Sequence, residues 1–360
     1  MTLRYYIVRQ FATMVVVAFA ICAILIFMID FVELLREAGK GSDVGLGVLL
    51  WLAILRLPAY SEILLTFAVL VGSIASLLMM ARKSELAVMR AGGLSAWGLI
   101  SPCVIAALVL GVFSTTIYNP VAAAGRARAE VLFAEAFGKN SNFLRQSSGV
   151  PWLRQDSTDG PSVIAASAAA ENGVSLLGVR IVQFDEQNRF VERIDAKRAR
   201  LWDGFWLVED GWVSRVGHAP KQFESFTVAT YLSPERVKDA FGSIISLSFW
   251  ELPTLIDVVE RAGLSAAPYH VQYQLLWARP FLLAVMVLLA ATVSLKSFRS
   301  GGIQTMVVFG MVGGIGFFLL AEVSRQVGVA GLVAPWVAVW VPVSVACLVS
   351  ATVLLYQEDG

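Results

Sequence analysis

Charged residues are scarce in this chain. Only 15% of its 360 residues are charged, whereas a soluble domain of this length carries roughly a quarter. The shortage is uneven, because long stretches near both ends are almost free of charge while the middle has the composition of a globular protein. This mosaic excludes a single soluble domain. It predicts an α-helical membrane bundle with a soluble domain inserted into it.

The residue patterns of common catalytic and metal sites are also missing. The two histidines lie far from the three cysteines, so we expect no zinc site. The cysteines all lie in apolar runs, so the middle domain folds without disulfides. The sequence has no glycine-rich loop followed by Lys and Ser or Thr, no nucleophile elbow and no His-Glu-x-x-His pattern. We therefore expect no catalytic residue, no metal ligand and no enzymatic activity in this chain.

Six apolar segments are long enough to cross a bilayer, which takes about 20 residues because every backbone amide must bond internally. The second contains Pro58, and is either one kinked helix or a short interfacial piece followed by a span from Ile63. The first is too long for a signal peptide and ends in Asp30, so we expect a retained helix. The predicted spans are Phe11–Ile29, Leu46–Met80, Ala96–Tyr118, Leu275–Leu295, Ile303–Val323 and Leu332–Tyr356.

Lysine and arginine in the short connections predict the orientation of these spans. They gather before the first span, between the second and third, and between the fourth and fifth, which places both termini in the cytoplasm. The residues concerned are Arg4, Arg9, Arg82, Lys83, Arg90, Lys296 and Arg299. The predicted domains are therefore 1–118 with three spans, 119–268 outside the cytoplasm, and 269–360 with three more.

The central domain is predicted to be all-β. Val179–Phe184 and Phe190–Ile194 alternate apolar and polar residues around a turn at residues 185–188. Asp203-Gly204 and Asp210-Gly211 predict two further tight turns. Short strands at regular spacing are typical of an open barrel or a sandwich.

A helix is predicted after these strands, at residues 251–262. Leu252, Leu255, Val258 and Val259 share one face of it, opposite charged residues. We expect a juxtamembrane helix that lies on the bilayer surface and joins the β domain to the fourth span.

The second cytoplasmic connection predicts a short helix at residues 84–92. Ser84 can cap its N-terminus, Glu85 suits the positive end of the helix dipole, and Gly92 can end it. Leu86, Met89 and Arg90 then share one face. From the residues alone, a helix resting on the membrane and a helix docked in a groove of a partner are equally supported.

These segments resemble the LptF/LptG family of lipopolysaccharide export permeases. Ser84–Gly93 is similar to the coupling segment of the family. Phe31–Gly41 and Glu251–Pro280 resemble the LptG branch in particular. The order of three spans, a β domain and three spans extends the resemblance over nearly the whole chain.

The resemblance implies a permease subunit of an ABC transporter in the inner membrane. Such a subunit extracts lipopolysaccharide and passes it to a periplasmic bridge of jelly-roll domains, for export to the outer membrane. The implied partners are the paralogous permease LptF, a homodimer of the cytoplasmic ATPase LptB, and the jelly-roll proteins LptC and LptA. LptB would bind the ATP, and this chain would bind no cofactor. The central domain is then periplasmic and jelly-roll-like.

The resemblance also implies roles for particular residues. In the coupling helix, which begins after Ser84, Glu85 would lie at the docking face, Leu86 and Met89 would be apolar anchors, and Arg90 would be a charge at the rim. Cations near the outer leaflet would bind lipid A phosphates, which pair well with arginine. The candidate lipid-binding residues are Arg36, Lys40, Arg56, Arg279 and Arg325.

Three of these expectations leave alternatives open. Arg36 and Lys40 are equally consistent with interfacial anchoring. Arg279 lies in an apolar run and must face a cavity, which we favour, or a carboxylate. Gly310, Gly313 and Gly314 permit close helix packing, either within the bundle or at an interface with a partner helix. Asp30 stands where known relatives carry lysine, which implies either a less phosphorylated lipid A or a different pattern of lipid contacts.

Two other functions fit the pattern less well. Another ABC-type permease for lipids or lipoproteins would place its domain after the first of four spans. A membrane-anchored scaffold or sensor with a β ligand-binding domain would not need the helix around Glu85.

Overall fold

The computed structural model describes the chain as two compact units. The first unit comprises Met1–Arg36, Leu49–Arg126 and His270–Gly360, and the second comprises Glu37–Val48 and Ala127–Tyr269. The described residues are 2–39, 44–137, 152–155, 160–170, 175–185, 187, 189–202, 204–215, 219–231, 247–261, 266–300 and 303–359.

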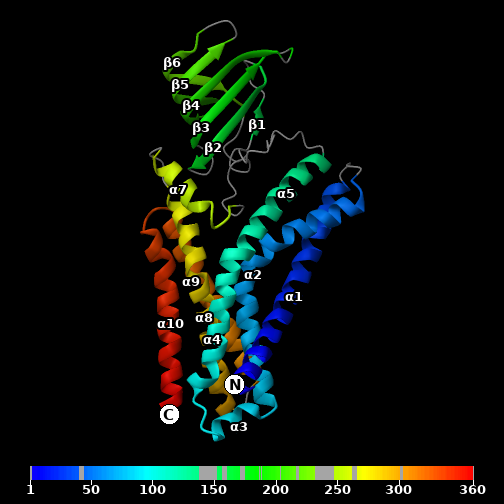
Figure 1. Cartoon of the computed structure of the whole chain (residues 1–360), viewed down its shortest axis with the longest axis vertical. Coiled ribbons are helices and arrows are strands. Elements are labelled where there is room, and N and C mark those ends of the chain that lie inside the picture. Colours follow the sequence, from blue (N-terminus) through cyan, green and yellow to red (C-terminus); the bar gives the residue numbers. More distant parts are fainter. Residues whose placement is uncertain are drawn as a thin grey trace. The chain divides into compact units, whose positions relative to one another are not determined.

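The first unit is a bundle of long apolar helices (Figure 1). Six helical segments within the described residues are long and apolar enough to cross a membrane, which confirms the expected number of spans. Both ends of the chain lie at the same end of this bundle as the short helix α3 (Glu85–Ala91). The spans are built from α1 (Thr2–Ala38), α2 (Leu46–Arg82), α4 (Ala96–Phe113), α8 (Ala267–Ser300), α9 (Ile303–Val329) and α10 (Pro335–Asp359).

The second span forms one helix, as one of the two alternatives predicted, and the third span differs from expectation. The helix α2 runs through Pro58 without interruption, so the alternative of a separate interfacial piece before Ile63 is wrong. The third span does not end at Tyr118, because a π-helical turn, η1 (Ser114–Tyr118), leads directly into α5 (Asn119–Phe137). Pro120 therefore lies inside a continuous helix, two residues after the π turn, and proline and π turns are the usual sources of irregularity in long helices.

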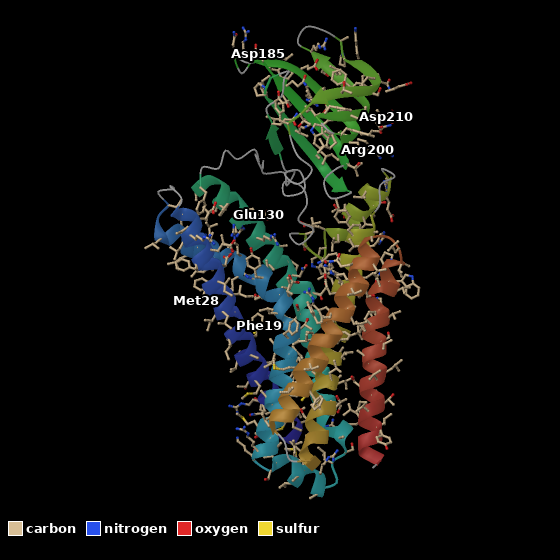
Figure 2. The ribbon with its side chains drawn as sticks, turned by 180° about the vertical axis from the view of Figure 1, so that it is seen from behind. Phe19, Met28, Glu130, Asp185, Arg200 and Asp210 are labelled. Carbon is tan, nitrogen blue, oxygen red and sulfur yellow. The ribbon has the colours of Figure 1, made fainter. Side chains whose placement is uncertain are left out.

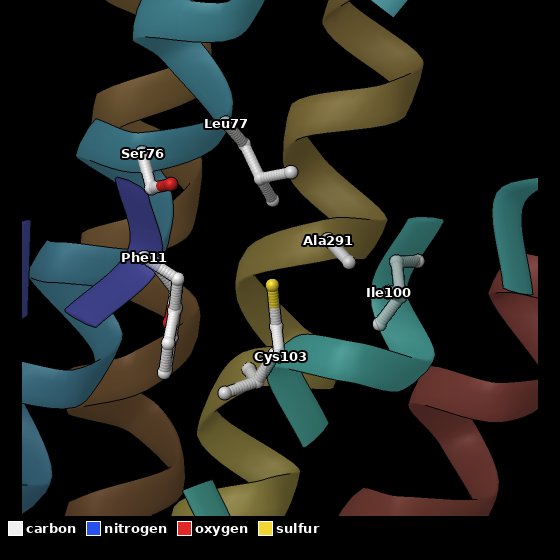
Figure 3. Close-up of a pocket in the computed structure, with 8 residues that line it drawn as sticks. Phe11, Ser76, Leu77, Ile100, Cys103 and Ala291 are labelled. Carbon is white, nitrogen blue, oxygen red and sulfur yellow. The ribbon is translucent and has the colours of Figure 1, made fainter. Parts of the chain in front are cut away.

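Apolar side chains from α1, α2, α3, α4 and α8 form the core of the bundle. Backbones approach closely where glycine permits it. A Cβ atom on Gly72 of α2 would lie 2.6 Å from the Cα atom of Val15 in α1. A small apolar cavity remains between Phe11, Leu77 and Cys103 (Figure 3).

The second unit contains one six-stranded antiparallel sheet in the order of the chain. An inserted all-β domain is therefore confirmed, and the predicted hairpin is formed by β3 and β4 (Figure 2). The strands are β1 (Trp152–Gln155), β2 (Ser162–Ala170), β3 (Ser175–Phe184), β4 (Phe190–Trp202), β5 (Phe205–Arg215) and β6 (Lys221–Ala229).

A line of irregular positions crosses this sheet, which we call the crease. It passes through Gly178 in β3, Lys197 in β4 and Asp210 in β5, where the ladder pairing is interrupted and then resumes in the same register. Gly178 and Asp210 have φ values of 55° and 53°. The buried positions of β5 change parity there, from Trp206 and Val208 before it to Gly211 after it. The set that faces the core therefore shifts by one residue at the crease.

The predicted turn at Asp210-Gly211 is wrong for this reason. Asp-Gly favours positive φ, and Asp210 does adopt it, but β5 continues through the pair to Arg215. Gly211 is required by close packing, because a Cβ atom there would lie 2.6 Å from the backbone oxygen of Asp195. The predicted turn at Gly204 does connect β4 to β5, while Asp203 lies outside the described residues.

The first and last strands meet at one end of the sheet through a buried amide. Gln155 of β1 accepts hydrogen bonds from Trp206 Nε1 at 3.2 Å and Thr230 Oγ1 at 2.5 Å. Its Nε2 donates to Ser162 Oγ at 2.9 Å and to the backbone oxygen of Ala229 in β6 at 3.3 Å. The sheet is therefore curled like an open barrel. The Greek-key connections of a jelly roll are not seen among the described strands, whose order is a meander.

The helix α7 (Leu252–Arg261) forms close to the predicted bounds. Its apolar face is buried at Leu252, Ile256 and Val259, and the helix packs against β2. The face that we expected to rest on a bilayer is therefore covered by protein.

Candidate functional site

The predicted coupling helix is present as α3, between α2 and α4. Ser84 precedes it with a φ of 59°, and its side chain makes no capping hydrogen bond, so the expected cap is absent. Gly92 ends the helix as expected, with its N–H donating to the backbone oxygen of Val88 at 2.9 Å. The left-handed residue that follows is Gly93, with a φ of 83°.

The apolar side of α3 faces the chain itself. Leu86 is 2% exposed and belongs to the core of the bundle, and Met89 packs against the same core. Leu86 is therefore not an anchor for a partner, because the bundle already supplies the apolar surface that this amphipathic helix needs. Val88 is the large apolar side chain of α3 that remains on the outside, at 70% exposure. Arg90 is half-buried.

The carboxylate of Glu85 has a partner within the chain. The Tyr6 hydroxyl donates to its two oxygens, at 3.0 and 2.9 Å, and thereby joins α3 to α1. A second polar contact joins α1 to α2 nearby, from Gln10 Nε2 to Met79 Sδ at 2.8 Å. Sequence reasoning missed Tyr6, because nothing in the sequence indicates which helix lies beside α3.

Arg279 meets a carboxylate, not a cavity. Its Nη1 donates to Glu62 Oε1 in α2, and to Ser114 Oγ in η1 at 3.3 Å. Asn119 Nδ2 donates to the same Glu62 oxygen at 3.0 Å. Glu62 and Arg279 are 9% and 18% exposed. The favoured expectation of a cavity-facing arginine is thus corrected, since a guanidinium among apolar helices is stabilised by an opposite charge. The available signal was a second charge, Glu62, within another apolar run.

Two more of the candidate lipid-binding cations have carboxylate partners. Arg56 of α2 lies 3.6 Å from Asp30 of α1, and the other oxygen of Asp30 is buried with no hydrogen-bond partner among the described residues. Arg325 pairs with Glu322 within α9 at 2.6 Å. Arg36 is exposed, and Lys40 lies outside the described residues. Three of the five candidates are therefore neutralised within the chain.

The glycines of α9 divide between two environments. Added Cβ atoms on Gly310 and Gly314 would collide with Ile74 and Leu70 of α2, so these two glycines permit packing within the bundle. Gly313 has open space around it and is exposed. Of the three glycines predicted for a partner interface, Gly313 alone faces outward.

Comparison with known proteins agrees with this arrangement. The family described as lipopolysaccharide export system permease LptF/LptG matches residues 5–356. The lipopolysaccharide export system permease protein LptG of Escherichia coli K12 is 24% identical over 362 residues, which cover 98% of both chains. The LptG protein of Haemophilus influenzae Rd is 25% identical over 316 residues, which cover 84% of both chains. Because the family match spans almost every span, strand and connection described above, the chain belongs to the LptF/LptG family of lipopolysaccharide export system permeases.

Proposed function

We propose that this chain is the permease subunit of an ABC transporter that extracts lipopolysaccharide from the inner membrane. It passes the lipid to a periplasmic jelly-roll bridge for export to the outer membrane. Membership of the LptF/LptG family and the relatives named LptG support this function. The chain is a multi-pass inner-membrane protein, in keeping with its six apolar spans.

The chain works with other subunits in this proposal. The paralogous permease LptF completes the membrane part, an LptB homodimer binds and hydrolyses ATP, and LptC and LptA receive the lipid. This chain itself binds no nucleotide and contributes a lever and a lipid-facing surface. The end of the bundle that carries α3 and both termini faces the cytoplasm, in agreement with Arg4 and Arg9 in α1 and Arg82 at the end of α2. The β domain between the third and fourth spans lies in the periplasm.

The attachment of α3 is the observation that carries the proposal. Leu86 holds α3 in the core of the bundle, and Glu85 holds it to α1 through Tyr6. A helix fixed in this way moves with the spans that it contacts, as a lever must. Its outer side, with Val88, is left for the ATPase, while Glu85 and Arg90 lie at the edge of that contact.

Lipid handling follows from the cations described above. Arg36 is exposed at the end of α1 and binds a phosphate of lipid A directly, as does Lys40. Arg56 and Arg325 bind phosphate only after release from Asp30 and Glu322. The acyl chains lie against the exposed apolar side chains of α1, such as Ile21, Ile24 and Leu25.

The experiment that tests this function uses the full chain co-expressed with its partner subunits and reconstituted into vesicles that contain lipopolysaccharide. ATP hydrolysis and ATP-driven release of lipopolysaccharide to an added jelly-roll acceptor are measured together. Val88→Glu places a charge on the outer side of α3 and should reduce co-purification of the ATPase by about tenfold or more. The matched control is Leu332→Glu, at a 77% exposed leucine between α9 and α10.

The Leu332→Glu control should still co-purify with the ATPase and release lipopolysaccharide. A wild-type chain that recruits no ATPase and releases no lipopolysaccharide would exclude the proposed function. A scaffold or sensor would instead leave lipid release absent in every variant, including the control.

A further inference from the structure

Three membrane helices are irregular in the region around the Glu62–Arg279 pair. Pro58 lies inside α2, four residues before Glu62, and Pro280 lies inside α8, directly after Arg279. Between α4 and α5 the helix widens into η1. Proline removes a helical hydrogen bond, and π turns inside helices occur frequently at functional sites. Each of these helices therefore has an interruption in its regular backbone hydrogen bonding close to the Glu62–Arg279 pair.

The hydrogen bond that α8 lacks at Pro280 is replaced by one from η1. Pro280 has no N–H, so the backbone oxygen of Leu276, four residues earlier, lacks its normal helical donor. Thr115 Oγ1 donates to this oxygen at 2.9 Å. The neighbouring Thr116 behaves differently, because its hydroxyl donates to Val112 within its own helix at 2.8 Å. Thr115 thus replaces a backbone bond of α8 with a bond between two helices.

The backbones of α4 and α8 touch at the same place. An added Cβ atom on Gly111 would collide with the Cα atom of Pro280. The two helices are therefore in contact through their backbones at this point, without an intervening side chain.

Polar side chains complete the connection to α2. Glu62 accepts from both Arg279 and Asn119, and Arg279 also donates to Ser114. Ser61 Oγ and Tyr118 Oη are hydrogen-bonded at 2.6 Å. Ser114, Thr115 and Asn119 are 1%, 5% and 3% exposed. Buried polar groups at membrane depth are functional candidates by default, and these groups bind each other.

We propose that Glu62, Thr115, Asn119 and Arg279 form a joint. This joint transmits the movement of α3 to α8, the first of the three membrane helices that follow the β domain. The inference rests on the proposed function, in which α3 is the lever. The part of α2 from Glu62 to Arg82 and the whole of α4, which includes Pro102, lead from this joint to α3. At 1.5 Å per residue, each is an arm roughly 30 Å long. Movement of α3 turns both arms about the joint, and α8 follows through Arg279 and Thr115.

The joint is tested in the full transporter by the amount of lipopolysaccharide released per ATP hydrolysed. Thr115→Val removes the interhelical hydrogen bond and should lower this ratio about five-fold, the factor that corresponds to one hydrogen bond. Thr116→Val is the matched control and should retain the wild-type ratio. Glu62→Gln should lower the ratio by about tenfold or more, because Arg279 then loses its counter-charge. The rate of hydrolysis should stay close to wild type in both variants.

Three outcomes would overturn the joint while leaving the proposed function intact. A wild-type ratio in both Thr115→Val and Glu62→Gln would show that the contact does not transmit movement. A fall in hydrolysis and release by the same factor, with a lowered melting temperature, would show a purely structural role. Loss of bound lipopolysaccharide in Arg279→Lys, with an unchanged ratio, would make Arg279 a lipid ligand. A wild-type chain without ATP-driven release would instead exclude the proposed function itself.

Discussion

The hydroxyl of Tyr6 donates hydrogen bonds to the carboxylate of Glu85, across a separation of 79 residues in the sequence. The acidic side chain that the family resemblance assigns to the docking face is thus already engaged by the first membrane helix. A partner that binds Glu85 must share it with Tyr6 or displace Tyr6. The contact also gives α1 a direct connection to α3, in addition to the covalent connection through α2.

Replacing Tyr6 by phenylalanine should loosen α3. A helix of seven residues is too short to be stable alone and depends on its tertiary contacts. We expect amide hydrogen exchange in residues 85–91 to become roughly three-fold faster in Tyr6→Phe. Mass spectrometry of the full chain in detergent measures this, with Tyr5→Phe as the control at a 70% exposed neighbour. Equal exchange in both variants would contradict a stabilising role for the contact.

Removing the charge of Arg56 alone should destabilise the chain more than removing the charges of Arg56 and Asp30 together. Asp30 is the more buried partner, at 8% side-chain exposure against 20%, and one of its oxygens has no hydrogen-bond partner among the described residues. Arg56→Met leaves this carboxylate uncompensated and should destabilise the chain by about 2 kcal/mol. The double variant Asp30→Asn/Arg56→Met should recover most of that loss. Thermal unfolding in detergent measures both, with the exposed Arg36→Met as a control that should change little.

The glycines of α9 should separate packing within the chain from binding to a partner. Gly314→Ala collides with the flexible end of Leu70 and should destabilise the isolated chain by about 1 kcal/mol. Gly313→Ala meets open space and gains helix propensity, so it should stabilise the isolated chain by up to about 1 kcal/mol. If Gly313 lies at a helix interface with the second permease, Gly313→Ala should weaken co-purification of that subunit. Unfolding of the single chain and pull-down of the pair distinguish the two effects.

The β domain should lose stability in acid through Asp195. Burial disfavours the charge of Asp195, but hydrogen bonds and charges of Arg193 and Arg180 outweigh this and lower its pKa below 3.8. Because the pKa of Asp195 is lower in the folded state than in the unfolded state, its charged form stabilises the fold above pH 3.8. This contribution is lost as the pH falls through the folded pKa. Pepsin cleavage of the full chain should therefore accelerate more steeply below pH 3.8 in wild type than in Asp195→Asn. Parallel profiles would show that the contacts of Asp195 add no stability.

Much of the architecture could be predicted because hydropathy and alternation are local properties. An apolar run has few alternatives to a membrane helix, so the six spans and the inserted β domain followed directly from the sequence. The failures arose where a local signal has two structural solutions. Asp210-Gly211 favours positive φ, which serves a turn as well as it serves the crease. An apolar run that ends near Tyr118 is compatible with a helix that stops there and with one that continues, as this helix does through α5 to Phe137.

The site was less predictable because it depends on which helices are neighbours. Arg279 was recognised as an unusual charge, but only the fold shows that Glu62, Ser114 and Asn119 surround it. Leu86 was correctly placed on the apolar side of a short helix. The surface that covers Leu86 belongs to the same chain, and a pattern within one helix carries no information on that point.

The crease makes the sheet unusually sensitive to changes in strand length. One additional residue in β5 after Asp210 would turn the remainder of that strand inside out, while Trp206 and Val208 would keep their places in the core. Single-residue insertions should therefore damage one half of the domain and spare the other. During evolution, the strands on either side of this line can lengthen or shorten independently, but only in steps of two residues.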